Sequence, residues 1–195
     1  DPDNPDSLMA RASWYRSKGE ANHYYRTLAL NDLDRVVELD RPDPAMAFHM
    51  RADILQKMGL HARAIEDYSK VIQADLADHW ITGAWLGRCR SEEALELFRE
   101  AVASCSQVVQ RKGPDYGYAT LARGIVFLKM NEFDAAIADL DAAAKRLLYP
   151  AQAFFARGVA KRRTGNIAGG DSDVLAAIRM DANVVEKMDK RGVKP

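Results

Sequence analysis

An arginine followed by a small residue recurs at nearly regular intervals along this chain of 195 residues. The arginines are spaced 40, 37, 35 and 34 residues apart, at Arg11, Arg51, Arg88, Arg123 and Arg157. A period of this length is typical of helical repeat arrays, in which each repeat is one small unit that packs on its neighbours. The spacing therefore predicts a series of short helical repeats rather than a globular domain.

A second motif shares this period. A segment of small and apolar residues begins thirteen residues after four of the arginines, at Ala64, Ala101, Ala136 and Gly170. In the first unit the interval from Arg11 to Ala29 is 18 residues, which indicates five extra residues near 22–26. Two independent motifs with one period make chance a poor explanation for the repeats.

Each unit is predicted to be a pair of helices. In the second unit, residues 45–57 are followed by a break at Gly59, and residues 61–74 resume with apolar residues three and four apart. Residues 118–147 and 151–180 repeat the pattern. The third unit has no Gly or Asn at the corresponding turn, so its break is expected near Ser91, with a long helix to Gln110. About ten helices plus a short terminal one are predicted.

These units resemble the tetratricopeptide repeat, whose pattern of small and large apolar residues is met in the second unit by Phe48, Ala52, Leu55, Gly59, Ala64, Tyr68 and Val71. The resemblance covers roughly residues 5–182. It implies an all-α, right-handed α-solenoid of bacterial type, forming one domain over residues 1–195. The expected repeats are 5–42, 45–78, 79–114, 117–150 and 151–182. Residues 183–191, with Val184, Val185 and Met188 on one side, are expected to cap the last repeat.

The arginines occupy a position where the family commonly has leucine, and an aspartate recurs later in the same repeats. The aspartates are Asp32, Asp67, Asp139 and Asp173, while the third unit has Ser104 at this position. We expect the arginines and aspartates to form a ladder of ion pairs, within or between neighbouring repeats, that satisfies half-buried guanidinium groups. Separations above about 4 Å would contradict this hypothesis.

Composition and motifs exclude several functions. Lys and Arg total 28 and Asp and Glu total 28, so the zero net charge argues against a nucleic-acid binder. No apolar run approaches the roughly 18 residues of a membrane span. Phosphate-binding, zinc-protease and nucleophile-elbow motifs are absent, and His49 with Asp53 gives only two possible metal ligands. We therefore expect a non-catalytic protein with no cofactor and no metal.

The two cysteines and the chain start bear on cellular location. Cys89 and Cys105 are expected to be small core residues, and in an exported protein they would lie close enough to form a disulfide. The chain begins at Asp1 without Met, which is consistent with a removed signal peptide or with trimming. An exported or periplasmic location and a cytoplasmic one both remain open.

The resemblance implies that the first helices of the repeats line a concave groove that binds a partner. Projected onto this sequence, the candidate groove residues are His49, Met50, Asp53, Lys57, Tyr118, Leu121, Ile125, Lys129, Gln152, Phe155, Val159, Arg162 and Arg163. They would form an apolar floor with a basic rim to which Arg16 also contributes. The competing interpretation is that Leu121, Ile125 and Phe155 are buried between repeats.

This groove predicts a scaffold that binds a peptide or helical segment of a protein partner, amphipathic and with acidic flanks. The scaffold itself would be a monomer or a weak homodimer. The alternative is a structural repeat protein that self-associates into a homo-oligomer through its apolar faces.

Overall fold

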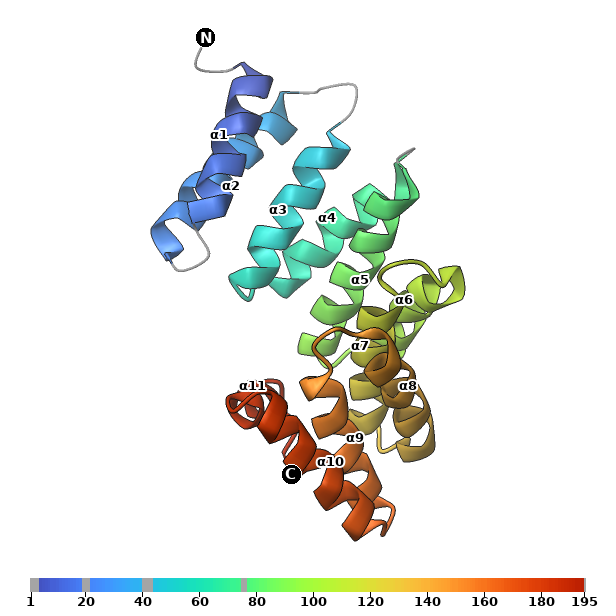
Figure 1. The fold of residues 1–195 in the computed structure, drawn as a ribbon. Coiled ribbons are helices and arrows are strands. Elements are labelled where there is room, and N and C mark those ends of the chain that lie inside the picture. The colour runs from blue at the N-terminus through green and yellow to red at the C-terminus, as the bar shows by residue number, and fades with distance from the viewer. Residues whose placement is uncertain (1–3, 19–21, 40–43, 75–76, 195) are drawn as a thin grey trace. The chain divides into compact units, whose positions relative to one another are not determined.

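The computed structural model describes residues 4–18, 22–39, 44–74 and 77–194, and these ranges form eleven helices and no strand (Figure 1). The first residues, including Asp1, lie outside them. The helices are α1 (Pro5–Lys18), α2 (His23–Glu38), α3 (Ala45–Lys57), α4 (His61–Gln73), α5 (Asp78–Ala94), α6 (Phe98–Arg111), α7 (Tyr116–Lys129), α8 (Phe133–Arg146), α9 (Ala151–Arg163), α10 (Ile167–Met180) and α11 (Val184–Lys190). None of the described helices has the length and hydropathy of a membrane span.

The helices form two compact units, Asp1–Ser91 and Glu92–Pro195. In the first unit α1 packs with α2 and α3 with α4, and α2 also packs against α3. In the second unit α7 packs with α8 and α9 with α10, while α6 lies against α7 and α8 against α9. Each unit is thus a stack of helical hairpins. That residues 1–195 form a single domain stays a prediction.

Small residues allow the paired helices to approach closely. A Cβ atom added to Gly158 of α9 would lie 2.7 Å from the carbonyl oxygen of Gly170 in α10, and one added to Gly124 of α7 would lie 2.8 Å from Cγ of Leu140 in α8. Both contacts are too short for a side chain, because interiors pack at near-crystalline density. Glycine at these positions therefore sets the spacing within the hairpins.

The third repeat turns later than the sequence predicted. The expected break near Ser91 is wrong, because α5 continues through Ser91 to Ala94 and α6 begins at Phe98. Glu96 in this turn adopts a left-handed φ of 60°. Gly59, Asn131 and Gly165 are the corresponding left-handed residues in the second, fourth and fifth repeats.

These four turn residues share one register, since each lies eight residues after the arginine of its repeat. The period of the arginines therefore predicts the turn even where glycine is missing.

The first repeat differs by a longer second helix. Its α2 has 16 residues, against 13 in α4, and starts at His23. The side chain of Asn22 accepts a hydrogen bond from the backbone N–H of Tyr24 and caps the helix. Three of the five extra residues predicted near 22–26 therefore lengthen α2 relative to α4.

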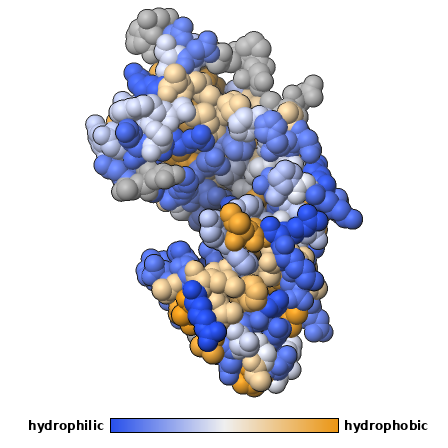
Figure 2. Space-filling model, viewed as in Figure 1, coloured by the Kyte–Doolittle hydropathy of each residue, from blue (hydrophilic) through white to orange (hydrophobic). Residues whose placement is uncertain are grey.

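The last hairpin keeps apolar surface on α10. Leu175, Ile178 and Met180 are all exposed there, and Leu148 and Tyr149 are exposed in the preceding loop. Figure 2 shows hydrophobic surface around α10 and α11. Because stacked repeats bury such a face against the next repeat, α10 presents the unpaired end of the stack.

Candidate functional site

The ladder of arginine and aspartate is present. In each of four repeats, Nε and Nη2 of the arginine donate to the two oxygens of one aspartate, at N–O distances of 2.6–2.8 Å. The pairs are Arg11–Asp32, Arg51–Asp67, Arg123–Asp139 and Arg157–Asp173. This bidentate geometry confirms the hypothesis from the sequence.

The same arginines also reach back to the preceding repeat. Nη1 of Arg51 donates to Asp34 at 2.8 Å, and Nη1 of Arg157 donates to Asp141 at 2.5 Å. In the corresponding place, Arg123 donates to the hydroxyl of Ser106 at 2.9 Å. These acceptors lie two residues after the ladder aspartate, or after Ser104 in the third repeat. The ladder is therefore a structural element that links repeats, and the guanidinium groups of Arg51, Arg123 and Arg157 are fully engaged in it.

In the first unit, polar groups gather on the side formed by α1 and α3. Asp53 is central: Oδ1 accepts a hydrogen bond from the Tyr68 hydroxyl at 2.9 Å, and Oδ2 lies 3.5 Å from Nη1 of Arg16 and 3.8 Å from Nδ1 of His49. The Asp53 side chain is 34% exposed. We call these four residues the Asp53 cluster.

The Asp53 cluster is mostly uncharged apart from one ion pair. Burial lowers the pKa of His49, although the Asp53 carboxylate opposes this, so the imidazole is neutral at pH 7. Burial also raises the pKa of Tyr68.

Two other predicted groove residues of the first unit lie outside this cluster. Met50 is buried in the core, and Lys57 is exposed at the end of α3. Within the described residues, no three His, Cys, Asp or Glu side chains come together as metal ligands.

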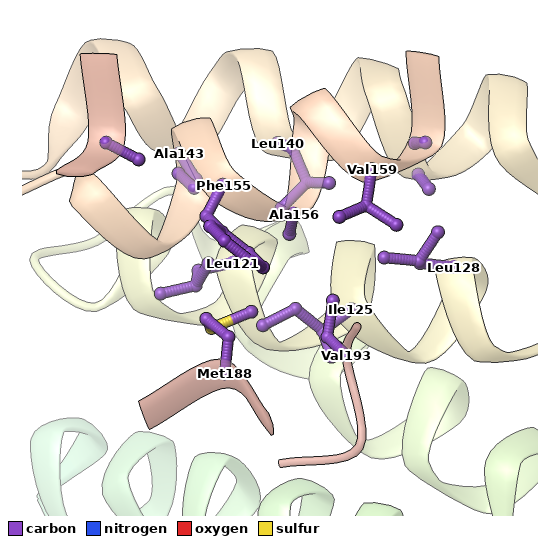
Figure 3. Close-up of a cluster of buried hydrophobic side chains, with 14 of the residues drawn as sticks. Leu121, Ile125, Leu128, Leu140, Ala143, Phe155, Ala156, Val159, Met188 and Val193 are labelled. Carbon is purple, nitrogen blue, oxygen red and sulfur yellow. The ribbon is translucent and has the colours of Figure 1, made fainter. Parts of the chain in front are cut away.

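In the second unit, four predicted groove residues come together on one face. Leu121 and Ile125 of α7 lie beside Phe155 and Val159 of α9 in a single apolar cluster (Figure 3). We call this surface of α7 and α9 the first-helix face. All four side chains are buried, and the competing interpretation anticipated this for Leu121, Ile125 and Phe155. Of the other candidates there, Tyr118 is half exposed and Gln152 is partly buried.

The cover of the first-helix face comes from the chain's own end, residues 184–194, which we call the C-terminal segment. Val184, Met188 and Val193 belong to the same apolar cluster and are buried. Figure 3 shows Met188 next to Leu121, and Val193 next to Ile125. Val185, which the sequence placed on the same side of the helix, is instead exposed.

A buried carboxylate holds the C-terminal segment by charge. Glu93, near the end of α5, is almost fully buried and accepts from Nη2 of Arg191 at 2.5 Å and from Nζ of Lys129 at 2.9 Å. Burial acts to raise the pKa of Glu93, but the charges and hydrogen bonds of Arg191 and Lys129 outweigh burial and hold the pKa below its ordinary value. Glu93 was not predicted from the sequence, because nothing local distinguishes it from a solvated glutamate.

The predicted basic rim is largely neutralised by neighbouring carboxylates. Lys129 pairs with Glu93, Arg16 with Asp53, and Arg162 with Asp171 at 2.7 Å. Arg163 is exposed and lines a cavity of about 290 Å³ beside Val193 and Val159. Few cations of the second unit are therefore left to attract the acidic flanks expected of a partner.

Neither cysteine offers a nucleophile. Cys89 and Cys105 are both fully buried, and neither is a free thiol.

The hairpin stacks and the ladder that links them define the class: a helical-repeat protein. Residues 45–78 match the model of the tetratricopeptide repeat. The predicted resemblance and the all-α solenoid fold class with its C-terminal helix are thus confirmed. Tetratricopeptide repeats serve in general as non-catalytic scaffolds for protein interactions.

Solved structures share the fold. A crystal structure of MamA superposes with a TM-score of 0.75 at 17% identity, covering 93% of this chain and 94% of that one. YrrB, described as a tetratricopeptide-repeat protein with an unusual peptide-binding site, gives 0.71 at 17% identity over 98% of this chain and 93% of that one. A tetratricopeptide repeat protein from Parabacteroides merdae gives 0.64 at 20% identity over 96% and 70%. No curated protein sequence matches the chain.

Proposed function

We propose that this chain is a non-catalytic interaction scaffold that binds a peptide or short helical segment of a protein partner on the first helices of its repeats. One observation carries the proposal. The first-helix face of the second unit holds an amphipathic helix, α11, through apolar anchors and the Arg191–Glu93 ion pair. A surface that accommodates such a segment of its own chain has the shape and chemistry to bind one from another protein.

The polar residues of the first unit also support the proposal. Its Asp53 cluster presents a part-exposed carboxylate beside a neutral imidazole and a guanidinium, without the metal ligands or the nucleophile that catalysis would need. Partly exposed polar groups around a rigid helix are suited to fixing the register of a bound peptide. The peptide-binding site described for YrrB is consistent with this use of the fold.

Affinity capture from the native host tests the proposed function. The wild type is compared with an Asp53→Asn, Tyr118→Ala variant, in which both changes are at part-exposed positions on the first helices. A Tyr149→Ala variant is the matched control, because Tyr149 is 84% exposed in a loop. We expect a protein that the wild type and the control retain and the double variant loses. Equal retention by all three would remove the first helices as the binding surface.

Self-association is the alternative function, and the exposed residues of α10 favour it. Leu175, Ile178 and Met180 are exposed apolar residues of α10 at the end of the stack, where a second copy would bury apolar surface. Light scattering over a concentration series separates the two functions. A chain that stays monomeric leaves self-association without support, whereas growth into higher oligomers would favour it.

A further inference from the structure

The C-terminal segment packs differently from a further repeat helix. Within the second unit, the first helix α9 packs extensively on α8, the second helix of the preceding repeat. A next first helix would pack on α10 in the same way, but α11 lies mainly against α9 and touches α10 little. The segment therefore occupies the first-helix face and leaves the end of the stack open.

Its contacts are those of a short ligand with spaced anchors. Val184 and Met188, one helical turn apart, are completely buried, while Val185 and Glu186 between them point outward. The helix then ends in a turn: Gly192 has φ 78°, and the backbone N–H of Val193 donates to the carbonyl of Met188 at 2.9 Å. This turn returns Val193 to the face as a third apolar anchor.

The ion pair with Glu93 adds specificity. The Glu93 side chain is only 4% exposed, so its charge needs buried cations, and Lys129 supplies one from the face itself. Arg191 supplies the second and donates three hydrogen bonds to the carboxylate. A partner without a cation at this position would leave Glu93 with one cation in place of two. The face thus selects a basic residue three positions after the second anchor.

We infer that the first-helix face of the second unit recognises a short amphipathic helix with apolar residues four apart, then a basic residue three positions on and an apolar residue two further. Residues 184–193 occupy this site in cis and compete with any partner segment of the same chemistry. This inference rests on the proposed function and names both the partner's pattern and the regulation of its site. A partner binds this face only when it displaces the C-terminal segment.

A peptide of the chain's own residues 182–194 is the probe, carrying a fluorophore and added in trans to the full-length chain. In the wild type the site is filled, and the apparent affinity falls by the fraction of molecules in which it is open. In a full-length Met188→Asp variant the tethered segment loses its central anchor. We expect this variant to bind the peptide roughly ten-fold or more tightly than the wild type does.

Matched controls establish which contacts matter. A Val185→Asp chain changes an exposed residue of the same helix and should bind the peptide as weakly as the wild type. Peptides carrying Met188→Asp or Arg191→Glu should lose binding to the open chain. If Met188→Asp unfolds the chain by circular dichroism, a full-length Arg191→Glu chain replaces it, since that change keeps all three apolar anchors.

Equal binding of the peptide by the wild-type and the opened chains would overturn the inference, as would no binding by a folded, opened chain. Failure here is distinguishable from failure of the proposed function. A partner captured through Asp53 and Tyr118 while the peptide does not bind would retain the scaffold function and remove cis occupation. Peptide binding without any captured partner would retain cis occupation of the face and leave the scaffold function without support.

Discussion

Single residues at the recurring arginine position carry most of the polar organisation of the repeats. Each of Arg51 and Arg157 clamps one aspartate of its own repeat and touches one of the repeat before it. The guanidinium of Arg157 also lies 4.6 Å from the ring centroid of Phe154, so its flat face is covered as well. The first pairing could be predicted because both residues recur with the period. Pairing between neighbouring repeats was also anticipated, but its acceptors Asp34 and Asp141 were not named from the sequence.

Replacing Arg157 by alanine should strongly destabilise the protein. The Arg157 and Asp173 side chains are 14% and 9% exposed, so the change leaves a buried carboxylate with only Lys161 for compensation. We expect a loss of about 3 kcal/mol in the free energy of unfolding, measured by urea denaturation.

Arg11→Ala is the control, because the Arg11 side chain is 53% exposed and its ion pair is screened by water. We expect its loss to be below about 1 kcal/mol. Equal losses for the two variants would show that burial does not set the value of the ladder contacts.

Among the elements, the turns show where the sequence indicated the structure and where it did not. Gly59 and Gly165 mark their turns directly, because glycine adopts a left-handed φ without steric cost. Glu96 adopts the same conformation with no local signal, and the predicted break was therefore placed too early, at Ser91. Stacking of the repeats imposes the turn on Glu96 and overrides its preference.

Glu96→Gly should stabilise the chain. At φ 60° a residue with a Cβ atom is strained by about 1 kcal/mol or slightly more, and glycine relieves this strain. We expect a gain of roughly that size in the free energy of unfolding by denaturant titration. Asn131→Gly is the comparison, because asparagine tolerates a left-handed conformation better than glutamate, and its gain should be smaller. A loss at Glu96 would mean that its carboxylate makes contacts worth more than the strain.

The C-terminal segment should detach in acid. The pKa of Glu93 is lowered in the folded chain, so its ion pairs contribute stability above the ordinary value of 4.5, and this stability is lost as pH falls below it toward the folded pKa. The protection factors of residues 184–193, each corrected for the intrinsic exchange rate at that pH, should therefore fall below pH 4.5. A Glu93→Gln variant should show weaker protection near neutral pH and no such pH dependence. Unchanged protection of the wild type in acid would show that the apolar anchors suffice.

At the scale of the whole molecule, the repeat period predicted most of the helical fold. It did not predict that the C-terminal segment covers the first-helix face. Projection onto the family listed Leu121, Ile125, Phe155 and Val159 as groove residues, and the structure holds these four in one buried cluster. The projection did not show that Met188 and Val193 cover them, because an amphipathic helix at the chain end has two apolar surfaces within reach. One is the end of the stack at α10, and the other is the first-helix face. The pattern of residues 183–191 fits both.

The surface of α10 gives a prediction about the whole molecule. Leu175 and Met180 are each 53% exposed, so replacing both by lysine removes apolar surface without opening the core. We expect a change within about 0.5 kcal/mol in the free energy of unfolding and a higher solubility limit. Light scattering should show less association than for the wild type at high concentration. A large loss of stability would mean that the two side chains are buried in solution, as they would be in an oligomer.

Each ladder arginine that contacts an aspartate of the preceding repeat could make the same contact to a duplicated repeat. Arg157 donates a hydrogen bond to Asp141 of the preceding repeat, and that repeat has its own arginine, Arg123, at the matching position. A duplicate of residues 117–150 inserted after Pro150 would therefore present an arginine to Asp141 and an aspartate to Arg157. The ladder contacts at both new junctions would then be formed. An array connected in this way can be lengthened by whole repeats without redesigning these contacts.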